Sequence, residues 1–453
     1  MSSSVLTWGT DPASTPLLAS DRLRALERSH HAMWNYLTYR DAIGIVGLDP
    51  ARLYPGGTTR LDPSEWADLG WLTCFAGPPA SAVEAMRSAV TAEHLNQYSP
   101  DLVEPLRDAA ANVLGRERDD DFEVIGTEGA QAGIALSLMA VAGPGDEVIL
   151  SDPGYFHVPS AVIATGAVPI TVSIDASNGY RLDPEVVAAA ITPRTRAIVI
   201  VDPLNPYGTV QTADELAALA RLADRHDLLL VHDVTHGSLV IDPAVAFSSL
   251  PALGLTDNAV ATFSVSHCYG MAGARIGFLA GPARLMRSCL RLKAALTRLN
   301  TSLVAQHGAL AALRDEHYLR RAQRIVRRNL DHLNDTLARI DGLTLATSPV
   351  RGLACALDTS GAGVTSQELM VALFERRVAT YPGDGMGTTG AATNLRLNLS
   401  RPDPWAMEHL RAMLPEAIAE AAAGRWREPV AALLESKGTP RAIELAATVR
   451  SGL

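Results

Sequence analysis

From Phe122 onward, short apolar runs alternate in a regular order with segments that have the periodicity of helices. The apolar runs at residues 147–150, 197–201, 228–231 and 259–262 have the length of buried strands. Helical patterns such as residues 132–141 and 213–225 separate them. Because two parallel strands need a long crossover, usually a helix, this order predicts a mainly parallel sheet built from strand–helix–strand units.

The size and charge of the chain narrow the class of protein further. With 453 residues, 47% of them hydrophobic, the chain can bury a large core, and we expect a large domain plus a smaller one. A formal net charge of −10 argues against a nucleic-acid partner held by a basic surface. No apolar run is long enough to cross a membrane, and the first residues lack a secretory signal pattern, so we expect a soluble cytoplasmic protein. The 4 cysteines are scattered without the spacing of a disulfide framework or a zinc knuckle.

Polar residues follow the predicted strands where they end. Asn205 lies in an Asn-Pro-Tyr-Gly turn after residues 197–201, and Asp233 follows residues 228–231. Ligands of open α/β sheets bind at the carboxyl ends of the strands, which makes both residues candidates for a binding site. Gly129, Ala130 and Gln131 lead from a strand into a helix, whose free N–H groups could bind a phosphate.

The segment 262–277, Thr-Phe-Ser-Val-Ser-His-Cys-Tyr-Gly-Met-Ala-Gly-Ala-Arg-Ile-Gly, carries the most specific pattern. With Ser264, Gly270, Gly273 and Arg275 it resembles the cofactor-anchoring segment of the class I/II aminotransferases, the fold type I pyridoxal-phosphate (PLP) enzymes. The resemblance extends over residues 71–400. It implies a large domain with a mainly parallel seven-stranded sheet and a smaller α+β C-terminal domain.

The resemblance also implies roles in binding the cofactor. Ser264 and Arg275 would bind the phosphate together with the turn at residues 129–131, and Tyr155 would stack on the pyridine ring. Asn205 would reach the ring hydroxyl and Asp233 the protonated ring nitrogen. Tyr98 would cross to the cofactor phosphate of a second subunit, which implies a homodimer.

Three further positions concern the substrate and the chemistry. Arg396, in the segment 394–400, would bind a substrate carboxylate. His236 stands where the family usually has a tyrosine, and His267 stands where the family has the lysine that bonds to PLP. The chain contains only two lysines, Lys293 and Lys437. An imidazole forms no lasting imine with the PLP aldehyde, but it can move protons near neutral pH.

We therefore hypothesise that the chain binds PLP or pyridoxamine phosphate (PMP) noncovalently, or a preformed imine of PLP with an amino acid. His267, with His236, would act as general acid or base in a lyase-, dehydratase- or cyclase-type step on a carboxylate-bearing, amino-acid-like substrate. Two alternatives remain open. One is an enzyme without PLP, or a metal enzyme, with a centre of His232, His236 and His267; the other is an aminotransferase variant or a non-catalytic subunit paired with an active paralogue.

The predicted organisation has three parts. Residues 1–70 form an N-terminal arm with an amphipathic stretch at residues 23–45 and a break at residues 54–57. Its cluster of residues 30, 31 and 34–36 is either a lid over a substrate or a helix docked on the core. Residues 71–300 form the cofactor-binding large domain, and residues 301–453 form the small domain with the interdomain helix. The tail from residue 405 reads as two helices that break near residues 438–440.

Overall fold

The computed structural model describes residues 20–29, 31–32, 35–49, 61–241 and 247–453, and within them seven strands form one large sheet. The strands are β2 (Phe122–Thr127), β3 (Glu147–Asp152), β4 (Val168–Ser173), β5 (Thr195–Val201), β6 (Leu229–Asp233), β7 (Ala259–Ser264) and β8 (Gly277–Pro282). Their order is β2-β8-β7-β6-β5-β3-β4. Strands β4, β3, β5, β6 and β7 pair in parallel, whereas β8 is antiparallel to both β2 and β7. The predicted mainly parallel seven-stranded sheet is confirmed.

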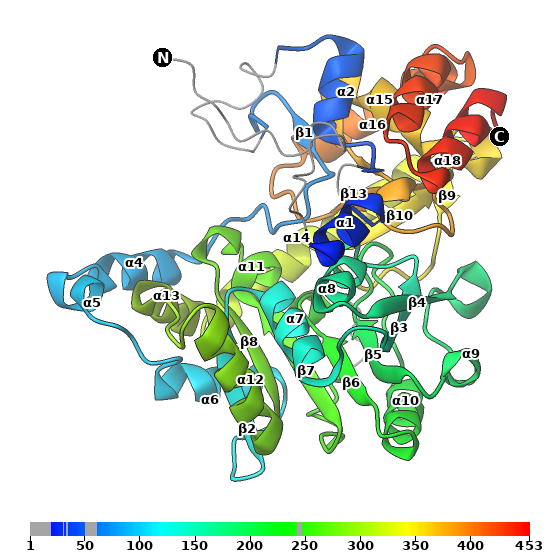
Figure 1. Cartoon of the computed structure of the whole chain (residues 1–453). Coiled ribbons are helices and arrows are strands. Elements are labelled where there is room, and N and C mark those ends of the chain that lie inside the picture. Colours follow the sequence, from blue (N-terminus) through cyan, green and yellow to red (C-terminus); the bar gives the residue numbers. More distant parts are fainter. Residues whose placement is uncertain (1–19, 30, 33–34, 50–60, 242–246) are drawn as a thin grey trace.

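Helices cover both faces of this sheet (Figure 1). They are α7 (Ala130–Val141), α8 (His157–Thr165), α9 (Pro184–Ala190), α10 (Ala213–Arg225) and α12 (Ala283–Leu296). The sequence of α10 shows why such a helix forms, since Thr212 and Glu215 make a capping box at its start. Its leucines recur on one face and join a core with residues of β5 and β6, while α7, α8 and α12 contribute to a second core.

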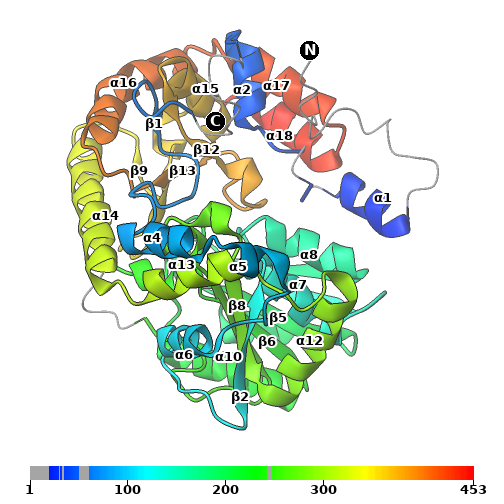
Figure 2. The same ribbon diagram turned by 90° about the vertical axis from the view of Figure 1, so that its left-hand side faces the viewer.

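A further group of helices lies beside the large lobe and connects it to the small lobe. It comprises α4 (Ala80–Ala89), α5 (Ala92–Asn96), α6 (Glu104–Val113), α13 (Leu303–Leu313) and α14 (Glu316–Leu337). Helix α13 packs on α4 and α6, and α14 runs from the large lobe to the small one (Figure 2). Helix α14 carries five exposed arginines, which is typical of a solvated helix face; they are Arg320, Arg321, Arg324, Arg327 and Arg328.

The smaller lobe is built on an antiparallel sheet with helices on it. Its strands are β12 (Tyr381–Pro382), β13 (Asn394–Asn398), β10 (Ala354–Asp358) and β9 (Thr344–Leu345), in that order, and β1 (Ala67–Asp68) pairs separately with β11 (Val378–Ala379). Helices α15 (Ser366–Glu375) and α16 (Trp405–Ala422) pack against each other here. Short helices elsewhere are α11 (Val265–Cys268), η4 (Ala176–Asn178), η5 (Gly237–Leu239), η6 (Ala272–Ala274), η7 (Ser360–Ala362) and η8 (Gly383–Gly385).

The tail differs from the sequence prediction of two helices. It forms three, α16, α17 (Arg427–Ser436) and α18 (Pro440–Ser451). The predicted break near residue 438 is present, but a further break lies at Gly424, whose φ of +76° ends the helical path after α16. The sequence pattern did not mark this break, because Gly424 directly follows three alanines, Ala421 to Ala423, which favour a helix.

The amphipathic N-terminal stretch forms two helices, α1 (Asp21–Arg28) and α2 (Tyr39–Val46). Helix α1 packs on α8 of the large lobe, and α2 packs on α15 and α17 of the small lobe. Residues 30, 34 and 54–57, named in the sequence analysis, lie outside the described residues. Among the helices that the structure describes, none is both long and apolar enough to cross a membrane.

Candidate active site

The carboxyl ends of three neighbouring strands and the start of α7 meet at one edge of the large sheet. The parallel register places Val201 beside Asp233 and Asp233 beside Thr262, so β5, β6 and β7 end together. Asn205 follows β5, Asp233 is the last residue of β6, and Ser264 is the last residue of β7. The fold therefore gathers residues that are up to 59 positions apart in the sequence, counted from Asn205 to Ser264.

The start of α7 and Arg275 form a cradle rich in hydrogen-bond donors. Gly129 caps the helix with φ +99°, and a Cβ atom there would stand 2.7 Å from Nη2 of Arg275. That nitrogen donates to the carbonyl of Glu128, and Nη1 donates to Ala272 at 3.0 Å. The first N–H groups of α7 and an exposed guanidinium thus stand together, which suits an anion such as a phosphate.

The other predicted phosphate ligands lie at the same end of the sheet. Ser264 is buried, and its Oγ accepts a hydrogen bond from the N–H of Ser266 at 3.3 Å. The side-chain amide of Gln131 donates to the carbonyl of His157 at 3.0 Å, and its Oε1 is buried without a partner. Ser264 therefore has a hydroxyl hydrogen to give, while the side chain of Gln131 faces α8.

Asp233 is a buried carboxylate with an open side. Its Oδ1 accepts hydrogen bonds from the N–H of Thr235, at 3.0 Å, and from the Thr235 hydroxyl. Within the described residues, no hydrogen bond reaches Oδ2. Burial raises the pKa of Asp233 above its ordinary value, which is the behaviour of an acid that lacks a cation. A positively charged ring nitrogen beside Oδ2 would restore its ionised form.

Tyr155, four residues after Ser151 near the end of β3, lies near these charges. Burial and then the Asp233 carboxylate raise the pKa of its hydroxyl, whereas Arg396 and Arg275 lower it. The hydroxyl is accordingly protonated at neutral pH. A neutral aromatic ring beside an anion and two guanidinium groups is suited to contact the face of a planar ligand.

The two histidines predicted to be catalytic face each other. The ring centroids of His236 and His267 are 5.0 Å apart, with an angle of 86° between the rings. Nδ1 of His267 is buried and has no hydrogen-bond partner in the described structure. Burial, with a smaller effect of Arg396 and Arg275, lowers the pKa of His267 to about 4. Burial also holds the pKa of His236 well below its ordinary value, so both imidazoles are neutral at pH 7.

Arg396 lies on β13, where the small lobe faces the sheet edge. Its Nη1 donates to Oδ1 of Asn205 at 3.3 Å and its Nη2 to the carbonyl of Gly70 at 2.7 Å. The guanidinium lies 4.4 Å from the centroid of the Tyr381 ring, and Nε is buried without a partner. These partners are neutral groups, and a buried guanidinium held by them can accept an anionic ligand.

His232 does not join this group. Its Nε2 lies 3.3 Å from Oδ2 of Asp202, and its Nδ1 accepts from the N–H of Leu250 at 3.4 Å. In the described ranges, no cluster of three or more His, Cys, Asp or Glu residues is arranged to hold a metal ion. His232 thus bonds to Asp202 and Leu250, whereas the rings of His236 and His267 contact each other.

Tyr98 and the two lysines have partners outside the group of residues described above. Tyr98 follows α5, is 73% exposed, and its ring centroid lies 4.3 Å from the guanidinium carbon of Arg298. The two lysines are bonded elsewhere. Lys293 bonds to Asp101 at 2.6 Å as well as to Gly126 and Thr301, and Lys437 bonds to Asp41 at 2.9 Å.

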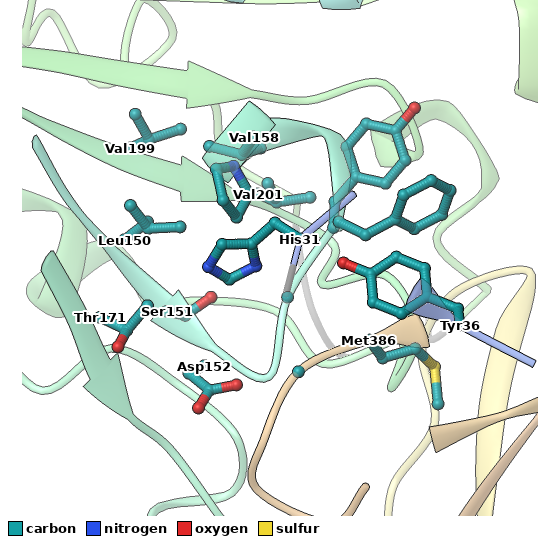
Figure 3. Close-up of a pocket in the computed structure, with 15 residues that line it drawn as sticks. His31, Tyr36, Leu150, Ser151, Asp152, Val158, Thr171, Val199, Val201 and Met386 are labelled. Carbon is teal, nitrogen blue, oxygen red and sulfur yellow. The ribbon is translucent and has the colours of Figure 1, made fainter. Parts of the chain in front are cut away.

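A pocket lies next to Tyr155 between α8, the sheet and the small lobe (Figure 3). It is lined by His31 and Tyr36 of the N-terminal segment, Phe156 and Met386, as well as apolar residues of β3 and β5. In Figure 3, the ring of His31 points toward Leu150 and Ser151. The sequence pointed to His31 and Tyr36 but not to Met386, which lies in a glycine-rich stretch without a periodic pattern.

Comparison with known proteins places this geometry in a family. Residues 72–414 match the model of the family described as aminotransferase class I and II. The chain belongs to the class I and II aminotransferase family. Among curated relatives, a probable aspartate/prephenate aminotransferase of Thermus aquaticus is 31% identical over 320 residues, 69% of this chain and 82% of the relative. An arginine–pyruvate transaminase of Pseudomonas aeruginosa is 30% identical over 282 residues, 62% of this chain and 71% of the relative.

Solved structures of family members agree with the fold. An aspartate aminotransferase of Thermus thermophilus, a single mutant, has a TM-score of 0.73 at 26% identity and covers 89% of this chain and 99% of its own. An aminotransferase of Mycobacterium tuberculosis has a TM-score of 0.70 at 29% identity, covering 78% of this chain and 92% of its own. The chain is an enzyme of fold type I, the fold of these aminotransferases.

Proposed function

We propose that this aminotransferase-fold enzyme binds PLP or PMP without a covalent bond and uses His267 to move protons in a lyase-, dehydratase- or cyclase-type step. The substrate is an amino-acid-like molecule with a carboxylate. The observation that carries the proposal is the Nδ1 of His267, which is buried, unpartnered and on a neutral imidazole at the sheet edge. A group in that state can accept a proton from a bound molecule.

The residues of the site fit the cofactor. The cradle of Gly129 and Arg275 suits its phosphate, the open Oδ2 of Asp233 suits its protonated ring nitrogen, and the Tyr155 ring suits its face. Asn205 would bind the ring oxygen by its amide. The cofactor, when bound, supplies an electron sink for negative charge that develops at the substrate. An anion is needed at position 233 because it keeps the ring nitrogen charged.

The histidine at position 267 supports binding without a covalent bond, because an imidazole forms no lasting imine with the PLP aldehyde. The ammonium group of Lys293 donates hydrogen bonds to a carboxylate, a carbonyl and a hydroxyl. Lys437 forms an ion pair with Asp41 of α2. With no amine at residue 267 to displace a product from the cofactor, water would have to release the product, which would slow repeated amino transfer. This favours lyase-type chemistry over repeated amino transfer.

His267 and His236 are the groups that we assign to proton transfer. His267 begins a cycle neutral, because its pKa of about 4 lies below the pH of the cell, and it can take a proton from the substrate carbon next to the carboxylate. His236 is neutral as well, and its ring stands 5.0 Å away, centroid to centroid. We assign His236 to a second proton transfer, either at the oxygen of the cofactor ring or at the leaving group of the substrate. Arg396 would bind the substrate carboxylate and hold the carbon near His267.

We also propose a homodimer, with Tyr98 reaching the site of the second subunit. Tyr98 is exposed, and so are four apolar residues: Val90 directly after α4, Leu95 on α5, Leu296 at the end of α12 and Leu299 beyond it. A group of exposed apolar side chains favours burial against a partner. Equilibrium ultracentrifugation of the chain and of a Tyr98→Asp, Leu95→Asp variant tests this, and a variant that remains fully dimeric would contradict it.

The experiment for the chemistry measures exchange of the substrate proton. The full chain is incubated with PLP in heavy water, and loss of the α-proton of each of a panel of amino acids is followed by NMR. We expect exchange for at least one amino acid, and a loss of about 100-fold or more in His267→Ala, the size typical of removing a general base. His267→Ala that exchanges at the wild-type rate would remove His267 from the mechanism. A chain that binds neither PLP nor PMP would favour a non-catalytic subunit.

A further inference from the structure

The C-terminal helix α18 makes a contact that leads toward the proposed cofactor site. Arg441, in the first turn of α18, donates through Nη2 to the carbonyl of Thr388 at 2.7 Å. Its Nη1 bonds to Glu444 of the same helix at 2.9 Å. Helices α17 and α18 pack side by side (Figure 1) and follow the residues 72–414 that the family model matches. The contact therefore connects a part of the chain outside the matched segment to the loop before β13.

Thr388 in turn holds a residue of the large lobe. Its N–H donates to Oδ1 of Asp152 at 2.7 Å and its hydroxyl donates to Oδ2, so both carboxylate oxygens are bound by one residue. Asp152 is buried and ends β3. Gly387, beside Thr388, has no room for a side chain, since a Cβ atom would lie 2.0 Å from Oδ1 of Asp152. The two lobes are in direct contact at this point.

Asp152 begins the turn that carries Tyr155. The turn reads Asp-Pro-Gly-Tyr, and the N–H of Gly154 donates to the carbonyl of Met386 at 2.7 Å. The loop at residues 386–388 therefore holds the turn at two points, from the small lobe. A shift of this loop would move the ring of Tyr155.

The segment around Thr388 and helix α18 face each other across a hollow. A pocket lies between them, lined by residues of the loop and by Arg441, Glu444, Leu445 and Thr448. The hydrogen bond from Arg441 is thus a polar connection beside this pocket, from the helix to Thr388.

We infer that Arg441 is a positioning residue for the cofactor site: through Thr388 and Asp152 it fixes the turn that presents Tyr155, so the C-terminal helix pair contributes to ligand binding. The part of this inference that concerns the cofactor rests on the proposed role of Tyr155. The part that concerns the turn rests on the hydrogen bonds alone.

The test compares the full chain with Arg441→Ala, Arg441→Lys and Arg450→Ala. Arg450 also lies on α18, but it bonds to Glu428 and Glu435 of α17 and not to the loop, which makes it the control for loosening the helix pair. Hydrogen exchange of the peptides around residues 152–156 and 386–388 is measured by mass spectrometry, and PLP affinity by absorbance titration.

We expect Arg441→Ala to exchange about tenfold faster in both peptides and to bind PLP about tenfold more weakly, the factor for one hydrogen bond from a charged donor. Arg441→Lys, which keeps a charged donor but not the planar fork that bonds Thr388 and Glu444 together, should fall between the wild type and Arg441→Ala in both measurements. Arg450→Ala should match the wild type in both.

Three results would overturn the inference: wild-type exchange in Arg441→Ala, faster exchange without weaker PLP binding, or equal effects in Arg450→Ala. If the wild-type chain binds neither PLP nor PMP, the proposed function fails. Hydrogen exchange of the cofactor-free chain and its Arg441→Ala variant then still decides whether Arg441 fixes the turn.

Discussion

The state of single side chains determines which reactions this site can support. An unperturbed imidazole has a pKa of about 6.5, and from the sequence His267 could serve equally as acid or base at neutral pH. Burial lowers its pKa to about 4 in the structure. His267 is therefore a base in the resting protein, and it acts as an acid only after taking a proton from the substrate. Anionic ligands nearby, such as a phosphate and a carboxylate, would raise its pKa.

Replacing His267 with lysine tests whether residue 267 occupies the position of the family's lysine. The variant should attach PLP covalently, because a primary amine there meets the cofactor aldehyde. Treatment with borohydride should then add one cofactor per chain, and peptide mapping should locate it at residue 267. His236→Lys is the matched control on the facing ring. Labelling of Lys293 or Lys437 instead would show that residue 267 does not face the aldehyde.

At the scale of single elements, the start of α7 depends on glycine. Gly129 has φ +99°, a conformation that side chains other than glycine rarely adopt, and a Cβ atom would displace Arg275. Gly129→Ala should lower the free energy of unfolding by about 1–3 kcal/mol. It should also weaken the binding of PLP and of inorganic phosphate, measured by titration.

Gly143→Ala is the control for this glycine, since a Cβ atom at Gly143 meets nothing within 4 Å. It should leave phosphate binding unchanged and change stability by less than about 0.5 kcal/mol. A Gly129→Ala protein that binds phosphate like the wild type would place the phosphate elsewhere.

Local sequence patterns predicted those elements whose signals are local. The apolar runs predicted β3, β5, β6 and β7, and the turn at Gly129 predicted the start of α7. Asn205 and Asp233 could be placed at strand ends. The bond between Thr388 and Asp152 spans 236 positions and leaves no periodic trace, so it could not be predicted. Likewise, the sequence could not show that His232 and His236 have different partners, because the contact between His232 and Asp202 exists only in the folded chain.

For the whole molecule, the buried histidines make stability depend on pH. Burial lowers the pKa of His157 and of His267 to about 4, whereas both titrate near about 6.5 in an unfolded chain. Between these values the unfolded chain binds protons that the folded chain does not, so stability falls as the pH falls from about 6.5 to about 4. Asp384 acts in the opposite direction below about pH 6, because burial raises its pKa to about 6.

His157→Asn tests this dependence away from the two facing histidines. The variant should take up one proton fewer on unfolding, so its melting temperature should fall less steeply than that of the wild type between pH 6.5 and 4.5. Calorimetry over this range measures the slope, and His226→Asn controls for the loss of an exposed histidine. Identical slopes for the wild type and His157→Asn would contradict a buried neutral imidazole at residue 157.

The central claim is that the whole molecule holds PLP by noncovalent contacts alone. The most direct measurement combines phosphate analysis of the PLP-loaded chain after rapid gel filtration with intact mass after borohydride treatment. We predict close to one phosphate per chain and no increase in mass, because neither lysine stands at the site. A mass increase of one reduced PLP on Lys293 or Lys437, or a chain that retains no phosphate at saturating PLP, would contradict the account.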